Sequence, residues 1–239
     1  MISKVMIIGS GQMGRGIAQV FAQAGFTVYL NDIKEEFVQR GLNNITKQLE
    51  RSVEKGRMSA DEKDQVLANL LPSVSYEDAK QVQLVIEAAT ENREIKLNIF
   101  KQLDELTDSK TILASNTSSL SITDIAAATK HQERVIGMHF FNPAPIMKLV
   151  EVIKALQTSE EVVQVVRELT VKIGKTPVDV KDSYGFVVNR ILIPMINEAI
   201  YILGEGVASA GEIDEAMKLG ANHPIGPLAL ADLIGLDVC

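Results

Sequence analysis

The feature that most constrains the fold is the phrase GSGQMGRG at residues 9–16, between the apolar run KVMII and the helix-periodic segment IAQVFAQAG. Glycines spaced G-x-G-x-x-G between a strand and a helix favour a dinucleotide-binding turn, particularly when an acidic residue follows about 20 positions later. Asp32 meets that requirement at the end of the next apolar run, TVYLND. In such a turn Gly9 permits the bend, Gly11 lets the backbone approach a pyrophosphate, and Gly14 brings the helix against the strand.

The same phrase predicts which cofactor binds. The helix start, with Gln12 and Met13, presents backbone N–H groups and a positive dipole end to phosphates. Asp32 would accept hydrogen bonds from the adenosine ribose hydroxyls and repel a 2′-phosphate, so NAD is preferred to NADP. The glycines by themselves leave two alternatives open, an FAD site and a purely structural turn.

Apolar runs of strand length alternate with helix-periodic segments, which predicts a parallel sheet with helices on both faces. The expected α/β fold is a Rossmann-like, doubly wound sheet. Its first strands are expected at residues 5–8, 27–31, 84–87 and 111–115. Residues 134–141 and 148–153 are also strand-like, but the link between them is too short for a crossover helix. These two strands are therefore expected to be antiparallel or close neighbours, followed by a helix and a last strand, TPVDV.

Residues 34–71 are longer than a simple crossover and predict a helical hairpin inserted in the fold. Ser59, followed three residues later by Glu62, is typical of a capping box at the start of the second helix. On the first helix, cationic side chains recur at a spacing that places them on one face: Lys47, Arg51 and Lys55. A solvated face and an anion site are both compatible with this stripe.

The pattern changes near Asp182, which we take as the boundary between a dinucleotide-binding domain at residues 1–182 and a helical domain at residues 183–239. The second segment is apolar and helix-periodic, and Pro194 is expected to kink it. Because it is too short for a core of its own, we expect it to pack on the first domain or on another subunit.

Composition excludes several classes of function. A net charge of −7 argues against a nucleic-acid partner, because phosphate backbones require clustered positive surface. One cysteine, Cys239, precludes an intramolecular disulfide and favours a reducing compartment. No apolar run is long enough for a membrane helix, the first strand leaves no room for a signal peptide, and no metal site is predicted. A soluble cytoplasmic protein is expected.

His139 is the strongest candidate for a catalytic base among the three histidines of the chain. His131 lies in a polar turn and is expected at the surface, and His223 has no obvious partner by spacing. The strand after His139 carries one acid, Glu151, in an otherwise apolar run, where a carboxylate is costly unless it is paired. A histidine oriented by a carboxylate is a general base poised near neutral pH. The alternative is a buried structural pair.

The loops after the predicted strands open on the same crevice, because ligands bind at the carboxyl ends of parallel strands. Glu91 and Lys96 follow one strand, and the phrase SNTSS at residues 115–119 follows the next. By itself SNTSS most often caps a helix, here through Ser118 and Ser119.

Several phrases together strongly resemble the L-3-hydroxyacyl-CoA dehydrogenases: the glycine phrase, IEAATENREIK, ASNTSSLSIT, GMHFFNPAPIMKLVEVI, KDSYGFVVNRIL and HPIGPLALADLIGLD. The bacterial 3-hydroxybutyryl-CoA enzymes look most similar. The resemblance implies an NAD-dependent oxidoreductase that interconverts 3-hydroxyacyl and 3-ketoacyl thioesters of coenzyme A. It also implies a homodimer formed through the C-terminal helices.

The resemblance assigns roles to individual residues. His139 would be the catalytic base, with Glu151 as its partner. Ser118 and Asn189 would hydrogen-bond the reacting oxygen of the substrate and its surroundings. The nicotinamide–ribose end of the cofactor site would be lined by Glu91, Lys96, Ser118 and Asn142. The cationic stripe of the hairpin, Arg51 and Lys55 in particular, would meet the coenzyme A phosphates.

One departure from the family pattern is at the C-terminus. The family continues in further helix-forming segments after a phrase like LADLIGLD, whereas this sequence stops at Cys239. We therefore expect weaker stability or altered association. The departure also keeps two alternatives open, an inactive NAD-binding homologue and a dehydrogenase of free 3-hydroxy acids.

Overall fold

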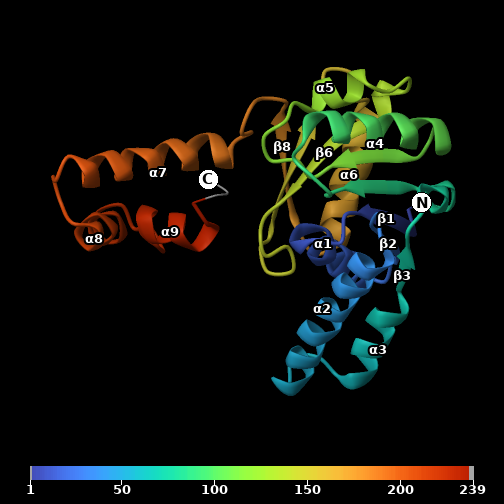
Figure 1. The fold of residues 1–239 in the computed structure, drawn as a ribbon, viewed down its shortest axis with the longest axis horizontal. Coiled ribbons are helices and arrows are strands. Elements are labelled where there is room, and N and C mark those ends of the chain that lie inside the picture. Colours follow the sequence, from blue (N-terminus) through green and yellow to red (C-terminus); the bar gives the residue numbers. More distant parts are fainter. Residues whose placement is uncertain (1, 237–239) are drawn as a thin grey trace. The chain divides into compact units, whose positions relative to one another are not determined.

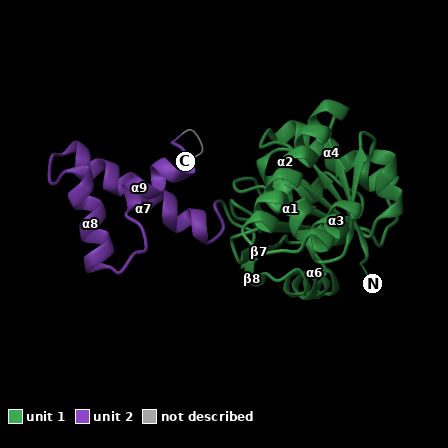
Figure 2. Cartoon of the chain, turned by 90° about the horizontal axis from the view of Figure 1, so that it is seen from below, with its two compact units in different colours: residues 1–184 green, residues 185–239 purple. Residues whose placement is uncertain are grey.

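The computed structural model describes residues 2–236 of the chain. It separates into two compact units, Met1–Tyr184 and Gly185–Cys239, which Figure 2 distinguishes by colour. Each unit is described by itself.

The first unit is built on one eight-stranded sheet with the order β3-β2-β1-β4-β5-β6-β7-β8 (Figure 1). Neighbouring strands are parallel except for β6 and β7, which are antiparallel. The strands are β1 Lys4–Ile8, β2 Thr27–Asn31, β3 Leu70–Ser73, β4 Leu84–Glu87, β5 Ile112–Ser115, β6 Val135–Phe140, β7 Leu149–Lys154 and β8 Thr176–Lys181. This topology confirms the predicted Rossmann-like fold and the antiparallel pair.

Helices cover both faces of the sheet. One face carries α1 (Gln12–Gln23) and α6 (Glu160–Lys172), and the other carries η1 (Tyr76–Gln81), α4 (Arg93–Leu106) and α5 (Ile122–Ala127). A short turn, η2 (Gln132–Arg134), leads into β6. Both sheet faces are thus buried, which explains why the central strands are apolar along their whole length.

The predicted helical hairpin is formed by α2 (Glu35–Glu54) and α3 (Ala60–Ala68), and it extends away from the sheet (Figure 1). Its inner face is apolar, with Val38, Ile45 and Leu49 buried. The capping box at α3 is present, because Ser59 Oγ accepts from Glu62 N at 3.1 Å and Ser59 N donates to Glu62 Oε2 at 2.7 Å.

Alternation along each strand divides its side chains between the two faces. On β6, Met138 and Phe140 join the core beneath α1, where the Phe140 ring lies 6.5 Å from that of Phe21. His139 between them consequently points to the opposite face, the one covered by α5. The same parity places Glu151 on that face, since Val150 and Val152 belong to the α1 side of the core.

The second unit contains α7 (Val188–Gly204), α8 (Ala210–Gly220) and α9 (Pro227–Ile234). Helix α7 continues through Pro194. The carboxylate of Asp214 on α8 accepts hydrogen bonds from Leu228 N at 2.8 Å and Ala229 N at 3.0 Å, which holds the start of α9 against α8. Within residues 2–236, no helix has the length and apolar character needed to cross a membrane.

Candidate active site

The glycine turn between β1 and α1 is closed on two sides and open on the third. Gly9 has φ +97°, and a Cβ there would lie 2.6 Å from the carbonyl oxygen of Ala88. A Cβ on Gly14 would lie 1.7 Å from the carbonyl oxygen of Gly9, so helix α1 packs directly on the turn. At Gly11 an added Cβ would meet no described atom within 4 Å. The turn therefore offers its backbone to a ligand at Gly11, as the pattern predicts for a pyrophosphate.

This turn lies at the point where the strand order reverses. Strand β1 has β2 on one side and β4 on the other, and the helices that follow β1 and β4 cover opposite faces of the sheet. The turn therefore lies at the position where open α/β sheets bind their ligands. The loop after β5 opens on the same edge, and its Asn116 Oδ1 accepts from Phe140 N of β6 at 2.9 Å. The loops that the sequence predicts to line a ligand site thus lie at one edge of the sheet.

Asp32 directly follows β2 and lies beside the turn. Ser10 N donates to its Oδ2 at 2.8 Å, Ser10 Oγ donates to the same oxygen at 2.7 Å, and Ile33 N donates to Oδ1 at 2.8 Å. The carboxylate is therefore held close to the glycine phrase by the residue between its first two glycines. Sequence reasoning did not single out Ser10, because the pattern treats that position as variable.

His139 and Glu151 face each other across the antiparallel strands β6 and β7, where they are directly paired in the register. His139 Nδ1 lies 2.8 Å from Glu151 Oε2, and both side chains are buried, with 7% and 1% exposed. The ring of Phe141 lies 4.5 Å from the imidazole. Because Nδ1 is hydrogen-bonded to a carboxylate, the neutral ring carries its basic lone pair on Nε2.

A second buried carboxylate lies on the same face of the sheet. Glu87, at the end of β4, forms an ion pair with Lys96 of α4, and their side chains are 0% and 1% exposed. Glu87 also accepts from Ala89 N at 2.9 Å and from Ser115 Oγ at 3.3 Å. Lys96 is thus placed under the β4–α4 loop rather than on its surface.

Glu91 joins that loop to the loop after β5. It accepts from Ser118 N at 2.8 Å, from Ser118 Oγ at 3.1 Å and from Thr117 Oγ1 at 2.8 Å, and it lies 3.9 Å from Lys96 Nζ. The expectation that Ser118 and Ser119 cap the next helix is wrong. Ser121 is the N-cap of α5, and its Oγ accepts from Asp124 N at 3.2 Å.

Asn142 reaches the glycine phrase from the loop between β6 and β7. Its Oδ1 accepts from Gln12 Nε2 at 3.0 Å. The same loop is held from below by Lys175, whose ammonium donates to Ala144 O at 2.6 Å and Met147 O at 2.7 Å. Burial lowers the pKa of Lys175. No signal in the sequence separated Lys175 from the other lysines, because its partners are backbone carbonyls distant along the chain.

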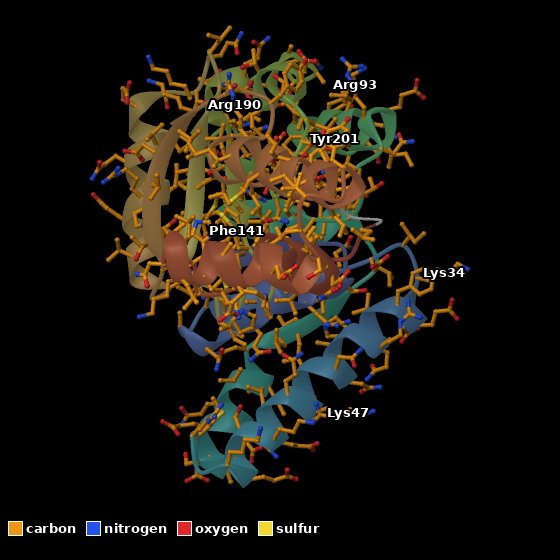
Figure 3. The ribbon with its side chains drawn as sticks, turned by 90° about the vertical axis from the view of Figure 1, so that its left-hand side faces the viewer. Lys34, Lys47, Arg93, Phe141, Arg190 and Tyr201 are labelled. Atoms are coloured by element: carbon orange, nitrogen blue, oxygen red, sulfur yellow. The ribbon has the colours of Figure 1, made fainter. Side chains whose placement is uncertain are left out.

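The remaining predicted site residues belong to the helical hairpin and to the second unit. Lys47, Arg51 and Lys55 are exposed on the hairpin, where Lys47 points outward from α2 (Figure 3). Asn189 lies in the first turn of α7, in the second unit. Their roles remain predictions.

The fold and the site define a class of protein. A glycine turn at the switch point of a parallel sheet, an acid at the end of β2 and a carboxylate-paired histidine at the same edge are the parts of a nicotinamide-dinucleotide-dependent oxidoreductase.

Comparison with known proteins specifies the family. Residues 4–183 match the NAD binding domain of 3-hydroxyacyl-CoA dehydrogenase, and residues 185–239 match the C-terminal domain of the same enzyme. The chain belongs to the 3-hydroxyacyl-CoA dehydrogenase family, and it is an NAD-dependent enzyme of that family.

Individual relatives are similar over the whole chain. A probable 3-hydroxybutyryl-CoA dehydrogenase of Bacillus subtilis is 55% identical over 238 residues, which cover 100% of this chain and 83% of that protein. The 3-hydroxybutyryl-CoA dehydrogenase of Clostridioides difficile is 55% identical over 235 residues, or 98% and 84% of the two chains. The crystal structure of (S)-3-hydroxybutyryl-CoA dehydrogenase from Ralstonia eutropha superposes with a TM-score of 0.97 at 53% identity, covering 100% of this chain and 84% of that one.

Proposed function

We propose that this enzyme interconverts (S)-3-hydroxybutyryl-CoA and acetoacetyl-CoA, with His139 as the proton-transfer residue. The observation that carries the proposal is the buried His139–Glu151 pair, which lies at the same carboxyl edge of the sheet as the dinucleotide turn. The short acyl chain is supported by the names of the relatives that match this chain from end to end.

The chemistry divides between cofactor and protein. When bound, NAD would supply the acceptor for the hydride that leaves C3 of the substrate. His139 Nε2 takes the proton of the 3-hydroxyl group, so the C3–O bond becomes a carbonyl, and reduction reverses both transfers. Glu151, hydrogen-bonded to Nδ1, stabilises the imidazolium as it forms. General base catalysis of this kind contributes roughly 10²–10⁴-fold to the rate.

The remaining residues are proposed to hold the reactants. Gly11 and the first turn of α1, with Gln12 and Met13, would hold the pyrophosphate, and Asp32 the adenosine ribose. Ser118 would hydrogen-bond the reacting oxygen, and Asn189 would be a further substrate ligand. Glu91 and Asn142 would line the nicotinamide–ribose end. Because Lys96 is 1% exposed, we propose that it acts there through Glu91 and the β4–α4 loop.

Three further features complete the proposal. The cationic stripe of α2, including Arg51 and Lys55, would bind the phosphates of coenzyme A. We place the enzyme in the cytoplasm, in keeping with its lone cysteine and with its bacterial relatives. We also propose a homodimer formed through the helices of the second unit.

The proposal is tested by measuring NADH oxidation with acetoacetyl-CoA and, separately, with the free acid acetoacetate as the alternative substrate. We expect turnover of the thioester, a loss of at least about 10²-fold in kcat for His139→Gln, and a smaller loss for Glu151→Gln. Glu133→Gln, an exposed carboxylate near the start of β6, serves as the control. NADH binding without turnover would favour an inactive homologue. Preferential use of acetoacetate would favour a dehydrogenase of free 3-hydroxy acids. An unchanged rate in His139→Gln would refute the role of His139 in proton transfer.

A further inference from the structure

Both carboxylate oxygens of Asp32 accept hydrogen bonds from groups of the protein itself. Ser10 N and Ser10 Oγ both donate to Oδ2, at 2.8 and 2.7 Å, and Ile33 N donates to Oδ1 at 2.8 Å. Each carboxylate oxygen has about two acceptor positions. Ser10 therefore fills Oδ2, while Oδ1 retains one position for a further donor.

Ser10 is itself fixed by the helix that follows β2. Its exposed fraction is 6%, and α2 passes over it at Gly41. A Cβ added to Gly41 would lie 3.0 Å from Ser10 Cβ and 3.1 Å from Ser10 O. On the strand side, Gly9 N donates to Asn31 O at 2.8 Å. The turn, α2 and β2 together leave Ser10 little freedom to release the carboxylate.

We infer that Ser10 is a positioning residue that sets the discrimination between NAD and NADP by locking the carboxylate of Asp32. With Oδ2 filled by both donors of Ser10, the carboxylate presents Oδ1 to one ribose hydroxyl. A 2′-phosphate at that hydroxyl would meet a negative charge that cannot rotate away. Without the Ser10 hydroxyl, Asp32 keeps its charge but gains the freedom to turn from the phosphate, so the penalty on NADP falls.

The experiment compares Ser10→Ala with the parent enzyme for both cofactors. The ratio of kcat/KM for NADH over NADPH is measured with acetoacetyl-CoA, and the Kd of each cofactor is measured by titration calorimetry. A hydrogen bond to a charged group is worth about 1.5–3 kcal/mol, which is roughly tenfold to a hundredfold in affinity. Because the backbone donor of Ser10 remains, we expect the ratio to fall by about five- to tenfold.

Two controls separate positioning from general loosening. Ser73→Ala removes another buried serine, 5% exposed, whose Oγ bonds Asn31 and Asp78 but not the Asp32 carboxylate. We expect it to leave the ratio unchanged. In an Asp32→Asn background, where no charge opposes the 2′-phosphate, Ser10→Ala should have no further effect on the ratio.

An unchanged ratio in Ser10→Ala, or an equal change in Ser73→Ala, would overturn the inference. It rests on the proposed function for the kinetic arm alone. If acetoacetyl-CoA were not turned over, the proposed substrate would fail, while the ratio of the two Kd values would still decide the role of Ser10.

Discussion

At the scale of single residues, the charged groups under the sheet edge are the most consequential. Glu87 and Lys96 are a buried ion pair, and a buried pair does not by itself stabilise a fold, because desolvation opposes the Coulomb attraction. This pair has additional partners, since Glu87 also accepts hydrogen bonds from Ala89 N and Ser115 Oγ. Its role is therefore to fix the β4–α4 loop, which touches the glycine turn at Ala88.

Breaking the pair on one side is expected to be costly. Glu87→Gln removes the buried counter-charge of Lys96 and leaves only the partly exposed Glu91, 3.9 Å away. Removing one partner of a buried pair typically destabilises a protein by about 3–5 kcal/mol. Urea unfolding monitored by circular dichroism measures the change. Glu105→Gln is the matched control on the same helix, because its pair with Lys130 is exposed and such pairs are worth about 0–1 kcal/mol. Equal effects in the two variants would contradict the argument.

At the scale of elements, the hairpin of α2 and α3 presents cations away from the sheet. Replacing Lys47 and Arg51 by Gln removes two exposed positive charges without touching the buried face of α2. We expect the KM for acetoacetyl-CoA to rise several-fold with kcat little changed, because rim charges contribute mainly uniform binding.

The control for this prediction is a thioester without phosphates. Acetoacetyl-N-acetylcysteamine should show the same KM in the parent and in the double variant. Lys110→Gln should leave the KM of both thioesters unchanged. A similar rise for both thioesters would show that the hairpin acts on something other than phosphate.

A hydrogen-bonded carboxylate joins the end of β8 to the start of α5. The carboxylate of Asp182 accepts from Ser121 Oγ at 2.7 Å, from Ile122 N at 3.1 Å and from Thr123 N at 2.8 Å. Burial acts to raise the pKa of Asp182, but hydrogen bonds from Thr123, Ser121 and Ile122 outweigh it and leave the pKa below its ordinary value. The chain is thereby tied to the start of α5 two residues before the first unit ends.

The lowered pKa of Asp182 fixes the sign of a pH dependence. Asp182 binds a proton less readily in the folded protein than in the unfolded chain. Its contribution to the free energy of unfolding is therefore present above the ordinary pKa of about 3.9 and is lost as the pH falls through the folded pKa. Asp182→Asn should lower the unfolding free energy at pH 7 by about 1–3 kcal/mol and flatten the acid loss. Urea midpoints between neutral and acid pH test this, with the exposed Asp64→Asn as control. Parallel acid curves for Asp182→Asn and the parent would contradict it.

The sequence predicted those elements whose signals are local. The strands flanking the glycine turn, the capping box at Ser59 and the antiparallel partner of β6 follow from periodicity, capping chemistry and loop length. Strand β3 was missed, because Leu70–Ser73 is short, contains Pro72 and continues the apolar pattern of α3. The hydrogen bonds of Asp182 and Lys175 were also missed, because their partners lie 59–61 and 28–31 residues away.

The candidate site was predicted to a similar degree. His139 and Glu151 were found because a single acid in an apolar strand requires a partner. The burial of Lys96 was not foreseen, because a lysine after a helix start is usually solvated. The lock on Asp32 was not foreseen either, since it depends on the rotamer of Ser10 beneath α2.

At the scale of the whole molecule, the second unit carries many exposed apolar side chains. The largest exposed fractions on its helices include Leu219, Leu233, Ile191 and Tyr201, at 78%, 74%, 66% and 59% (Figure 3 labels Tyr201). Apolar side chains gathered on a protein surface are typical of protein–protein interaction sites. This exposed apolar surface supports the proposed homodimer.

Sedimentation velocity is expected to show a dimer. Ile191→Glu combined with Tyr201→Glu should shift the protein to monomers, because two buried carboxylates would lie within an apolar interface. Tyr184→Glu, on an exposed tyrosine of the first unit, is the control and should remain dimeric. A parent that sediments as a monomer at micromolar concentration would refute the proposed dimer.

The pairing of β6 with β7 bears on how this gene tolerates length changes. Because side chains alternate between the faces of a strand, removal of one codon within β7 would turn Glu151 toward the core under α1 and bring a valine to His139. Losing two codons would restore the parity and shift only the position of the acid. A single-codon deletion in β7 ahead of Glu151 would therefore disturb both the packing under α1 and the His139–Glu151 pair.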